Sequence, residues 1–482
     1  MVFSSLIFLF FFLPITLTIY YIVGSRLRNI ALLAASLFFY TWGEGGYVLL
    51  MLTSIVLNYL FGLAIEYASS YRRRVIALSA AVTVNLLILF YFKYFNFVIE
   101  NINLLALHLD ISPLQPIESH LPIGISFFTF QALSYIIDIF RKTIAVQHNP
   151  LKLGLYIASF PQLIAGPIVR YHDVAKQLEH RQHTLDDIAI GVERFICGLG
   201  KKVLIANVMA EMADHIFAAP SSELSISTAW LGIACYTMQI YFDFSGYSDM
   251  AIGLGRIFGF RFLENFNYPY FSQSIREFWQ RWHISLSNWF RDYLYIPLGG
   301  NRVSPLRTYI NLLIVFILCG SWHGASWNFL VWGLMHGLFI ALERWKLATY
   351  LALMPRFIRH LYTMLIVIVG WVFFRAETME QAFSYLGAML GIGSDPQVNP
   401  WILNRADNLV FFTLAVAIVF SVPSMRMLYQ KVFPCGVVKY PDGSRCSTIM
   451  MSCRLVSVVG ILIFSSLSLA SGTYNPFIYF RF

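Results

Sequence analysis

Long runs of apolar residues without charge are the feature that most constrains this chain. Residues 2–23 and 47–65, for example, contain no charged side chain. A helix needs about 20 such residues to cross the hydrocarbon core of a bilayer, whereas an outer-membrane barrel shows alternating segments of about ten. The pattern therefore predicts an all-α polytopic membrane protein of about ten to twelve transmembrane helices, with additional re-entrant and amphipathic helices.

Composition and charge also indicate a membrane protein. Only 12% of the 482 residues are charged, about half the share of a soluble protein, and the aromatic content of 17% excludes a disordered chain. Basic clusters at residues 26–28, 72–74 and 141–142 follow the first, third and fifth apolar segments. Because cytoplasmic loops are enriched in Lys and Arg, these clusters predict a cytoplasmic location with the N-terminus outside. The net charge of +9 is thus explained by topology, and no nucleic-acid partner is expected.

One apolar stretch has the composition of a broken helix. Residues 153–167 are interrupted by Pro161, Gly166 and Pro167. Non-helical backbone at membrane depth is tolerated only where protein or a cavity covers it. We therefore expect a re-entrant or broken helix here, followed by a polar cytoplasmic segment at residues 170–183.

An ionisable residue inside an apolar segment is a functional candidate because it is costly to bury there. In the first such segment, residues 241–250, Asp243 and Asp249 flank Gly246. One interpretation is the polar floor of a cavity. The other is that the carboxylates cap the ends of a broken helix, which we favour for Asp249 and leave open for Asp243.

The second candidate segment is residues 274–295. Plotted as one helix, it places basic and polar residues on one stripe and aromatic residues on another, which is typical of the membrane interface. Arg276, Arg281 and Arg291 are candidate donor-binding residues, since guanidinium groups match phosphate. Anchoring to lipid headgroups without any ligand is an equally open interpretation.

The third candidate is His323, which follows Trp322 and precedes Gly324 in an apolar segment. An imidazole titrates near neutral pH and suits proton transfer with a hydroxyl group; the alternative is a core histidine bonded to a backbone carbonyl. His336 lies thirteen residues on, about 20 Å away along a straight helix. We therefore expect His336 to have a packing or gating role.

Several common chemical motifs are missing from the sequence. It contains no G-x-S-x-G, no phosphate-binding G-x-x-x-x-G-K-[ST] loop and no H-E-x-x-H. Its six cysteines form no C-x-x-C pair, so we expect reduced thiols. Neither a metal ion nor a bound cofactor is expected.

Five segments together resemble one family. Residues 121–142, 160–171, 243–260, 278–302 and 321–337 are similar to the membrane-bound O-acyltransferase family. The resemblance is strongest to the branch that acetylates bacterial polysaccharides such as alginate, which is related to the teichoic acid D-alanyl transfer proteins. The family's catalytic histidine falls on His323 in the SWHG motif, and a second family histidine falls on His283 in the RWHIS motif.

The resemblance implies a fold and a reaction. The implied fold is one domain over residues 1–482, a ring of helices around a thin central funnel, with a motif-rich catalytic core at about residues 121–345. The implied reaction moves an acetyl group from cytoplasmic acetyl-coenzyme A across the bacterial inner membrane to an exported polysaccharide, most plainly alginate, through an exported periplasmic acetyltransferase partner. Membrane lipid is a further expected partner. We expect Trp322, Asn328 and Asp243 to support the channel beside His323 and His283.

Two functions from other classes stay open at this point. One is a permease for a polysaccharide or a lipid intermediate, which would cleave no thioester. The other is a non-catalytic scaffold for an exported acetyltransferase, for which His323→Ala would leave polymer acetylation at the wild-type level.

Overall fold

The computed structural model of this protein describes most of the chain as helix. The described residues are 2–118, 120–164, 166–220, 223–393, 405–423, 445–472 and 474–476, without the side chains of 445–450. All regular elements within these ranges are helices, as the apolar runs predict. The end of the described chain returns to its beginning, because Asn475 hydrogen-bonds to Ser4 through both its side-chain oxygen and its nitrogen.

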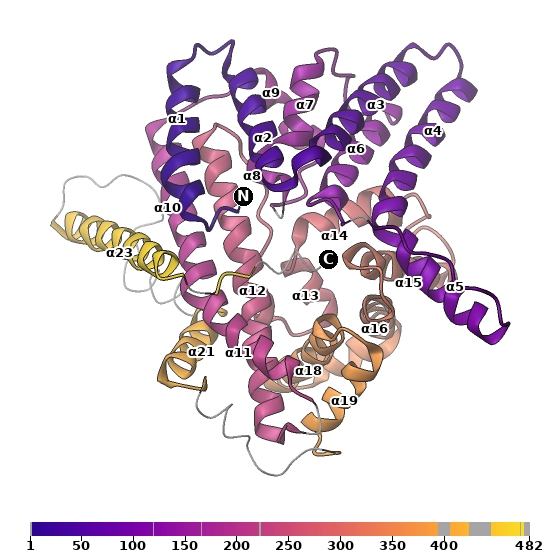
Figure 1. Ribbon diagram of the computed structural model, residues 1–482, viewed down its shortest axis with the longest axis vertical. Helices are drawn as coiled ribbons and strands as arrows, with labels where there is room; N and C mark the ends of the chain where they lie inside the picture. The colour runs from indigo at the N-terminus through magenta and orange to yellow at the C-terminus, as the bar shows by residue number, and fades with distance from the viewer. Residues whose placement is uncertain are drawn as a thin grey trace.

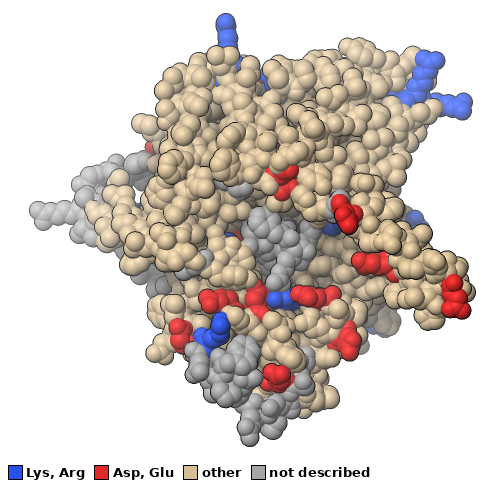
Figure 2. Space-filling model, in the orientation of Figure 1, with Lys and Arg blue, Asp and Glu red and all other residues tan. Residues whose placement is uncertain are grey.

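The N-terminal helices run up and down beside one another (Figure 1). They are α1 (Leu13–Ile22), α2 (Arg28–Glu44), α3 (Val48–Tyr67) and α4 (Tyr71–Leu89). The α1–α2 and α3–α4 connections lie together at the upper end in Figure 1, and Figure 2 shows Lys and Arg side chains projecting there. Two of the three basic clusters thus share one side of the molecule, as the predicted topology requires.

Five helical stretches among the described residues are long and apolar enough to cross a membrane. These are Arg28–Tyr67, Tyr71–His108, Pro305–His323, Arg356–Arg375 and Met451–Ala470. Shorter apolar helices cover Phe8–Ile22, Ile125–Phe140 and Asn408–Phe420. The chain is therefore a multi-pass membrane protein by composition and length, while the expected total of ten to twelve spans stays a prediction.

The broken helix predicted at residues 153–167 is confirmed. Helix α7 (Pro150–Ala158) stops at Ser159, and the four-residue α8 (Phe160–Leu163) continues in a new direction. Its end packs against Gly124, which starts α6 (Ile125–Phe140) with φ of 77°. A Cβ atom at Gly124 would lie 2.8 Å from the Leu163 carbonyl oxygen, so both the backbone angle and the space require glycine.

A long helix packs along a second one that is interrupted by a π-helical turn. Helix α10 (Leu185–Gly200) continues through the π-helical turn η4 (Lys201–Ala206) into α11 (Asn207–Ala218), and packs along the 32-residue α12 (Ile226–Ile257). The contact is close at Gly198 and Gly246, where each missing side chain leaves room for the other's carbonyl oxygen. Such small residues let helix backbones approach closely in membranes.

The expectation that Asp249 caps the end of a broken helix is wrong, and the same alternative, left open for Asp243, is also excluded, because α12 continues through both residues. The carboxylates instead pair with two consecutive lysines of η4. Lys201 Nζ lies 2.6 Å from Asp249 Oδ2, and Lys202 Nζ lies 2.8 Å from Asp243 Oδ1. Asp249 also pairs with Arg194. Buried charges are stable in this setting because they are paired.

The remaining helices are distributed over the whole molecule in Figure 1. They are η1 (Phe8–Phe12), η2 (Gly45–Tyr47), η3 (Phe90–Tyr94), α5 (Phe95–His108), α9 (Tyr171–Glu179), η6 (Pro269–Phe271), α13 (Ile275–Arg281), α14 (Ile284–Phe290), η7 (Arg291–Tyr295), α15 (Pro305–His323), α16 (Trp327–Leu342), η8 (Glu343–Leu347), α17 (Ala348–Leu353), α18 (Arg356–Arg375), α19 (Met379–Met389), α21 (Asn408–Phe420) and α23 (Arg445–Ala470).

The glycine contact between α10 and α12 yields a stability prediction. A Cβ atom at Gly198 would lie 2.5 Å from the Gly246 carbonyl oxygen and 2.8 Å from the Met250 nitrogen, both backbone atoms that cannot rotate away. We expect Gly198→Ala to destabilise the protein by about 1–3 kcal/mol through overpacking, measured as a lower thermal unfolding temperature in detergent. Gly460→Ala is the matched helical control, because open space surrounds Gly460; equal effects of both changes would contradict this account.

An ionic cluster ties the start of α9 to the end of α6 and to η7. His172 Nδ1 lies 2.8 Å from Asp138 Oδ2, and Tyr293 donates to the same oxygen at 2.9 Å. Arg170 pairs with Asp173 at 3.0 Å and with Asp292 at 2.6 Å. The hydrogen bonds from His172 to Asp138 and Asp173 raise the pKa of this half-exposed imidazole to about 9.

This raised pKa predicts how stability depends on pH. The folded-state pKa of His172 lies above the unfolded value of about 6.5, so its contribution is complete below about pH 6.5 and is lost as the pH rises through about 9. We expect the difference in melting temperature between the wild type and His172→Gln to be largest at pH 6 and to shrink by pH 10. A constant difference over that range would contradict the assignment.

Candidate active site

His323 lies at the end of a helix that stops inside the molecule. It is the last residue of α15, and Gly324 turns the chain away in extended conformation. A Cβ atom at Gly320 or Gly324 would collide with Phe329 of α16, so both glycines permit a close approach of the two helices. The end of α15 at His323 is therefore packed tightly on α16.

Aromatic rings enclose the His323 imidazole, which is only 4% exposed. Its ring centroid lies 5.1 Å from that of Trp332 and 5.2 Å from that of Phe374. A further ring nearby is the imidazole of His283, at a centroid distance of 6.5 Å. The two histidines that the family resemblance singles out, 40 residues apart in sequence, thus lie next to each other.

His283 stands at a break in the chain rather than within a helix. The stripe of basic residues predicted one helix over residues 274–295. This prediction is wrong, because α13 ends at Arg281 and His283 has φ of 44°. The turn is held from outside: Asn267 N–H donates to the Arg281 carbonyl and Ile284 N–H to the Asn265 carbonyl. The break buries His283 completely, whereas a regular helix would have kept it on the arginine face.

The hydrogen bonds of His283 fix its proton. Its Nδ1 lies 3.2 Å from Asn265 Oδ1, and that oxygen also accepts from the N–H and Oγ–H of Ser285. Because the Asn265 oxygen only accepts, Nδ1 of neutral His283 carries the proton and Nε2 carries the lone pair. In the described part of the chain, this buried Nε2 has no hydrogen-bond partner.

The three candidate donor-binding arginines lie outside this buried pair. Arg281 pairs with Glu277 at 2.9 Å and Arg291 with its neighbour Asp292 at 2.7 Å. Arg276 is exposed and forms no ion pair with any described residue. Their proposed contact with donor phosphates stays a prediction, for which Arg276 is the least neutralised of the three.

The other predicted residues have packing roles around the histidines. His336 accepts from Trp279 Nε1 at 3.3 Å, and Trp332 contacts both His323 and His336, a geometry that fits the predicted packing role. The rings of Trp322 and His323 form a T-shaped contact, with their centroids 4.8 Å apart. Asn328 donates to the Ala376 carbonyl at 2.7 Å and so ties α16 to the end of α18.

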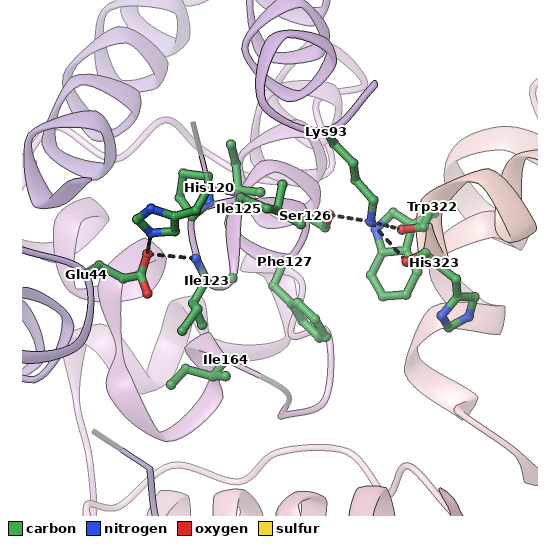
Figure 3. A pocket seen from close by; sticks show the side chains of 13 residues that line it. Glu44, Lys93, His120, Ile123, Ile125, Ser126, Phe127, Ile164, Trp322 and His323 are labelled. Atoms are coloured by element: carbon green, nitrogen blue, oxygen red, sulfur yellow. Dashed lines mark hydrogen bonds and ion pairs between the residues drawn. The ribbon is translucent and has the colours of Figure 1, made fainter. Parts of the chain in front are cut away.

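Lys93 is a residue of the site that sequence analysis missed. Its ammonium group donates to the Trp322 carbonyl, and it lies 3.3 Å from both the His323 carbonyl oxygen and Ser126 Oγ (Figure 3). Tyr94 donates to the Ser321 carbonyl at 2.9 Å. No described carboxylate forms an ion pair with Lys93. A lone charge within the apolar run 75–99 was the available signal.

Two cavities meet beside Lys93, which lines both. The first, of about 270 Å3, is lined by His323, Trp322, Ser126, Glu44 and His120. The second, of about 480 Å3, is lined by Gly324, Phe374, Gln239, Asp214 and Arg375. Glu44 ends α2, whose first residue Arg28 lies at the basic end of the molecule. The first cavity therefore reaches from His323 to Glu44, at the end of α2 opposite the basic loops, and Figure 3 shows these two residues on opposite sides of it.

The local arrangement supplies groups that acyl transfer needs. Among the described residues, no three His, Cys, Asp or Glu side chains are grouped so as to hold a metal ion. His323 lines a cavity of about 270 Å3, wide enough for a small acyl group, and His283 lies next to it as a second buried nitrogen base. A hydroxyl group that entered it would meet a proton acceptor in a water-poor environment.

Comparison with known proteins agrees with this geometry. Residues 37–377 match the membrane-bound O-acyltransferase family. The chain is 42% identical to a probable alginate O-acetylase of Azotobacter vinelandii, over the full length of both chains. It is 34% identical to a peptidoglycan O-acetyltransferase of Helicobacter pylori, with all of this chain and 98% of that protein covered. A teichoic acid D-alanyltransferase of Bacillus subtilis is 32% identical over 46% of this chain and 60% of its own length.

The family match covers both histidines, the broken helix at α7 and α8, and the helices that enclose them. With buried histidines paired at the end of α15 and full-length similarity to O-acetylating proteins, the chain belongs to the membrane-bound O-acyltransferase family and is an O-acyltransferase.

Proposed function

We propose that this protein carries acetyl groups from cytoplasmic acetyl-coenzyme A across the inner membrane for O-acetylation of an exported polysaccharide, with alginate as the substrate. The observation that carries the proposal is the pair of buried imidazoles, 6.5 Å apart between ring centroids, beside a cavity that extends away from the basic loops. The polysaccharide is suggested by the names of the full-length relatives, which are alginate O-acetylases.

The proposed reaction uses His323 as the general base. His323 takes the proton of an acceptor hydroxyl, whose oxygen attacks the thioester carbonyl carbon. The tetrahedral intermediate then expels the thiolate of coenzyme A, which takes the proton back from the imidazolium. One C–S bond breaks and one C–O bond forms, so the products are the O-acetyl ester and free coenzyme A, with no other reactant.

His283 fits a positioning role in this scheme. Its Nδ1–H is committed to Asn265, so its Nε2 lone pair is left to accept a hydrogen bond from the hydroxyl or from the donor. Asn265 thereby fixes one tautomer and one ring orientation, as the partner of a catalytic imidazole often does. His283 can thus orient a reactant while His323 moves the proton.

The different locations of donor and acceptor explain why the reaction would be placed inside the membrane. The thioester is made in the cytoplasm, whereas the polysaccharide is exported. A transfer site between both sides lets the acetyl group cross without crossing as a free acid. The acceptor hydroxyl of this scheme would belong to an exported partner acetyltransferase, which would then pass the acetyl group from its own ester to a hydroxyl of the polymer.

The histidines provide the first test of this function. General acid–base catalysis contributes about 10²–10⁴-fold in rate, so we expect His323→Ala to lose at least about a hundredfold of acetyl transfer while still binding donor. His323→Gln should not recover activity, because an amide cannot accept the proton. The measurement is transfer of label from acetyl-coenzyme A to the polymer or to the exported partner.

Two further variants act as controls. His283→Ala should lose less activity or mainly weaken donor binding, and His336→Ala should have the mildest effect because Trp332 lies between it and His323. A melting curve for each variant separates misfolding from lost chemistry. A folded His323→Ala variant that keeps more than about a tenth of the wild-type rate would refute the general-base role.

Lys93 holds the end of the helix that carries the proposed base. The last turn of a helix carries carbonyl groups without partners and a partial negative charge, and Lys93 meets both at the end of α15. It contacts the backbone of His323, so we treat it as a positioning residue. Its removal would let the end of α15 move and misplace the imidazole.

We expect Lys93→Met to lower kcat about tenfold or more, since a buried carbonyl left without a partner costs about 1–3 kcal/mol. The KM for donor should change little, because no donor contact is lost. Lys93→Arg should recover part of kcat, and Tyr94→Phe, which removes one neutral hydrogen bond to Ser321 from the same helix end, should have a smaller effect. Wild-type turnover of Lys93→Met would show that the helix end needs no cation.

The donor end of the reaction is testable through Arg276. If its guanidinium holds a donor phosphate, Arg276→Gln should raise the KM for acetyl-coenzyme A by a factor of about ten or more, the equivalent of a charge-assisted hydrogen bond. Turnover at saturating donor should stay near wild type, because only uniform binding is lost. Arg307→Gln, another exposed arginine at the start of α15, is the control. An unchanged KM in Arg276→Gln would favour lipid anchoring.

A further inference from the structure

A pair of arginines far from the histidines has cationic charge without a carboxylate partner. Arg28 begins α2 and Arg181 follows α9, and both are half-buried. Among the described residues, the hydrogen-bond partners of these guanidiniums are neutral: Arg28 Nη1 lies 3.3 Å from His183 Nδ1, and Arg181 Nη2 donates to Asn29 Oδ1 at 2.6 Å. The buried Nε of Arg28 has no partner there.

This differs from the other partly buried arginines nearby. Arg170, Arg194 and Arg256 each form an ion pair with an aspartate of the described chain. Half-buried charge is normally compensated in this way, because desolvation of a lone cation is unfavourable. Two such guanidiniums near one tyrosine ring, that of Tyr20, without a carboxylate to compensate them indicate that an anion from outside the chain completes the site.

Aromatic rings hold both guanidiniums in place. The Arg28 guanidinium carbon lies 5.5 Å from the centre of the Tyr20 ring, and that of Arg181 lies 4.4 Å from the centre of the Phe260 ring. Tyr20 is itself fixed, because its hydroxyl donates to the Phe258 carbonyl at 2.9 Å. Cation–π contacts orient a guanidinium while its N–H groups stay available to an acceptor.

His183 completes the arrangement as a neutral link. Burial and the two guanidiniums lower the pKa of His183, so its imidazole is neutral near pH 7. A guanidinium can only donate, so His183 Nδ1 accepts from Arg28 and its Nε2–H donates to the Tyr20 oxygen at 2.9 Å. The cluster therefore contributes two fixed positive charges and one neutral spacer.

The cluster lies farther from the histidines, counted along α12, than half the thickness of the hydrocarbon core. Phe244, whose ring contacts His283, and Phe258, whose carbonyl accepts from Tyr20, are fourteen residues apart along α12, or about 21 Å by the helical rise. Half of the hydrocarbon core is about 15 Å thick. The neighbouring Ile22, Leu27 and Ile30 are exposed apolar residues, as expected beside acyl chains.

We propose that Arg28 and Arg181 form a binding site for a phosphate group on the side of the basic loops, occupied by the headgroup of an anionic phospholipid. Both guanidiniums would donate to phosphate oxygens, and the uncapped N–H groups at the start of α2 lie beside them. The other source of the same chemistry is a free nucleotide phosphate, and the test separates the two. The site is independent of the transfer reaction proposed above.

The experiment measures ligand-induced shifts in melting temperature of the full chain in detergent micelles. The probes are dioctanoyl phosphatidylglycerol, dioctanoyl phosphatidylcholine and adenosine 3′,5′-bisphosphate, since a ligand that binds the folded state raises its stability with concentration. We expect phosphatidylglycerol to raise the melting temperature and phosphatidylcholine not to. The double variant Arg28→Gln/Arg181→Gln should weaken the apparent affinity for phosphatidylglycerol about tenfold or more.

The control is Arg72→Gln/Arg73→Gln, which removes two exposed arginines of α4 at the same end of the molecule. It should keep the phosphatidylglycerol shift. A shift with the bisphosphate that only the Arg28 and Arg181 changes abolish would retain the phosphate site but assign it to a nucleotide. The proposal is overturned if no anion shifts the wild type, or if both double variants respond alike; single variants serve if the double variant does not fold.

Discussion

A helix that ends in the protein interior is the constraint on which the centre of this protein depends. The carbonyl groups at the end of α15 lie beside buried residues, and each buried carbonyl left without a hydrogen-bond partner is costly. Lys93 and Tyr94, both from the π-helical turn η3, satisfy the carbonyls of residues 321–323. Because this helix end is satisfied, His323 stands at its tip between a cavity and a second histidine.

The opposite side of the histidine pair depends on α12. Its buried Asp243 pairs with Lys202, and the adjacent Phe244 places its ring 4.6 Å from that of His283. Lys202 also donates to the Pro476 carbonyl, so the end of the described chain is attached to the same helix pair. The break at His283 and the break at His323 are thus held from different elements, α12 with residues 265–267 on one side and η3 on the other.

Much of this architecture was predictable because hydrophobicity and backbone chemistry are local. The apolar runs, the basic connections, the proline-interrupted α7–α8 segment and the glycine-flanked His323 all follow from residue types that lie next to one another in sequence. The left-handed turn at His283 was not predictable. The spacing of its neighbours is helical, and the turn is imposed by Asn265 and Asn267. The ion pairs of Lys201 and Lys202 likewise need the π-helical turn η4, which sequence spacing does not reveal, and the contact of Lys93 with His323 spans 230 residues.

The central claim is that one buried histidine pair connects a donor on the side of the basic loops to an acceptor on the other side. Inverted membrane vesicles that contain the full chain and its exported partner test it most directly. Labelled acetyl-coenzyme A is supplied to the outward-facing cytoplasmic surface, and O-acetyl ester is measured in the sealed lumen. The account predicts labelled ester in the lumen with the wild type and none above background with His323→Ala. Equal lumenal label in both, or label that stays only on the donor side, would contradict it.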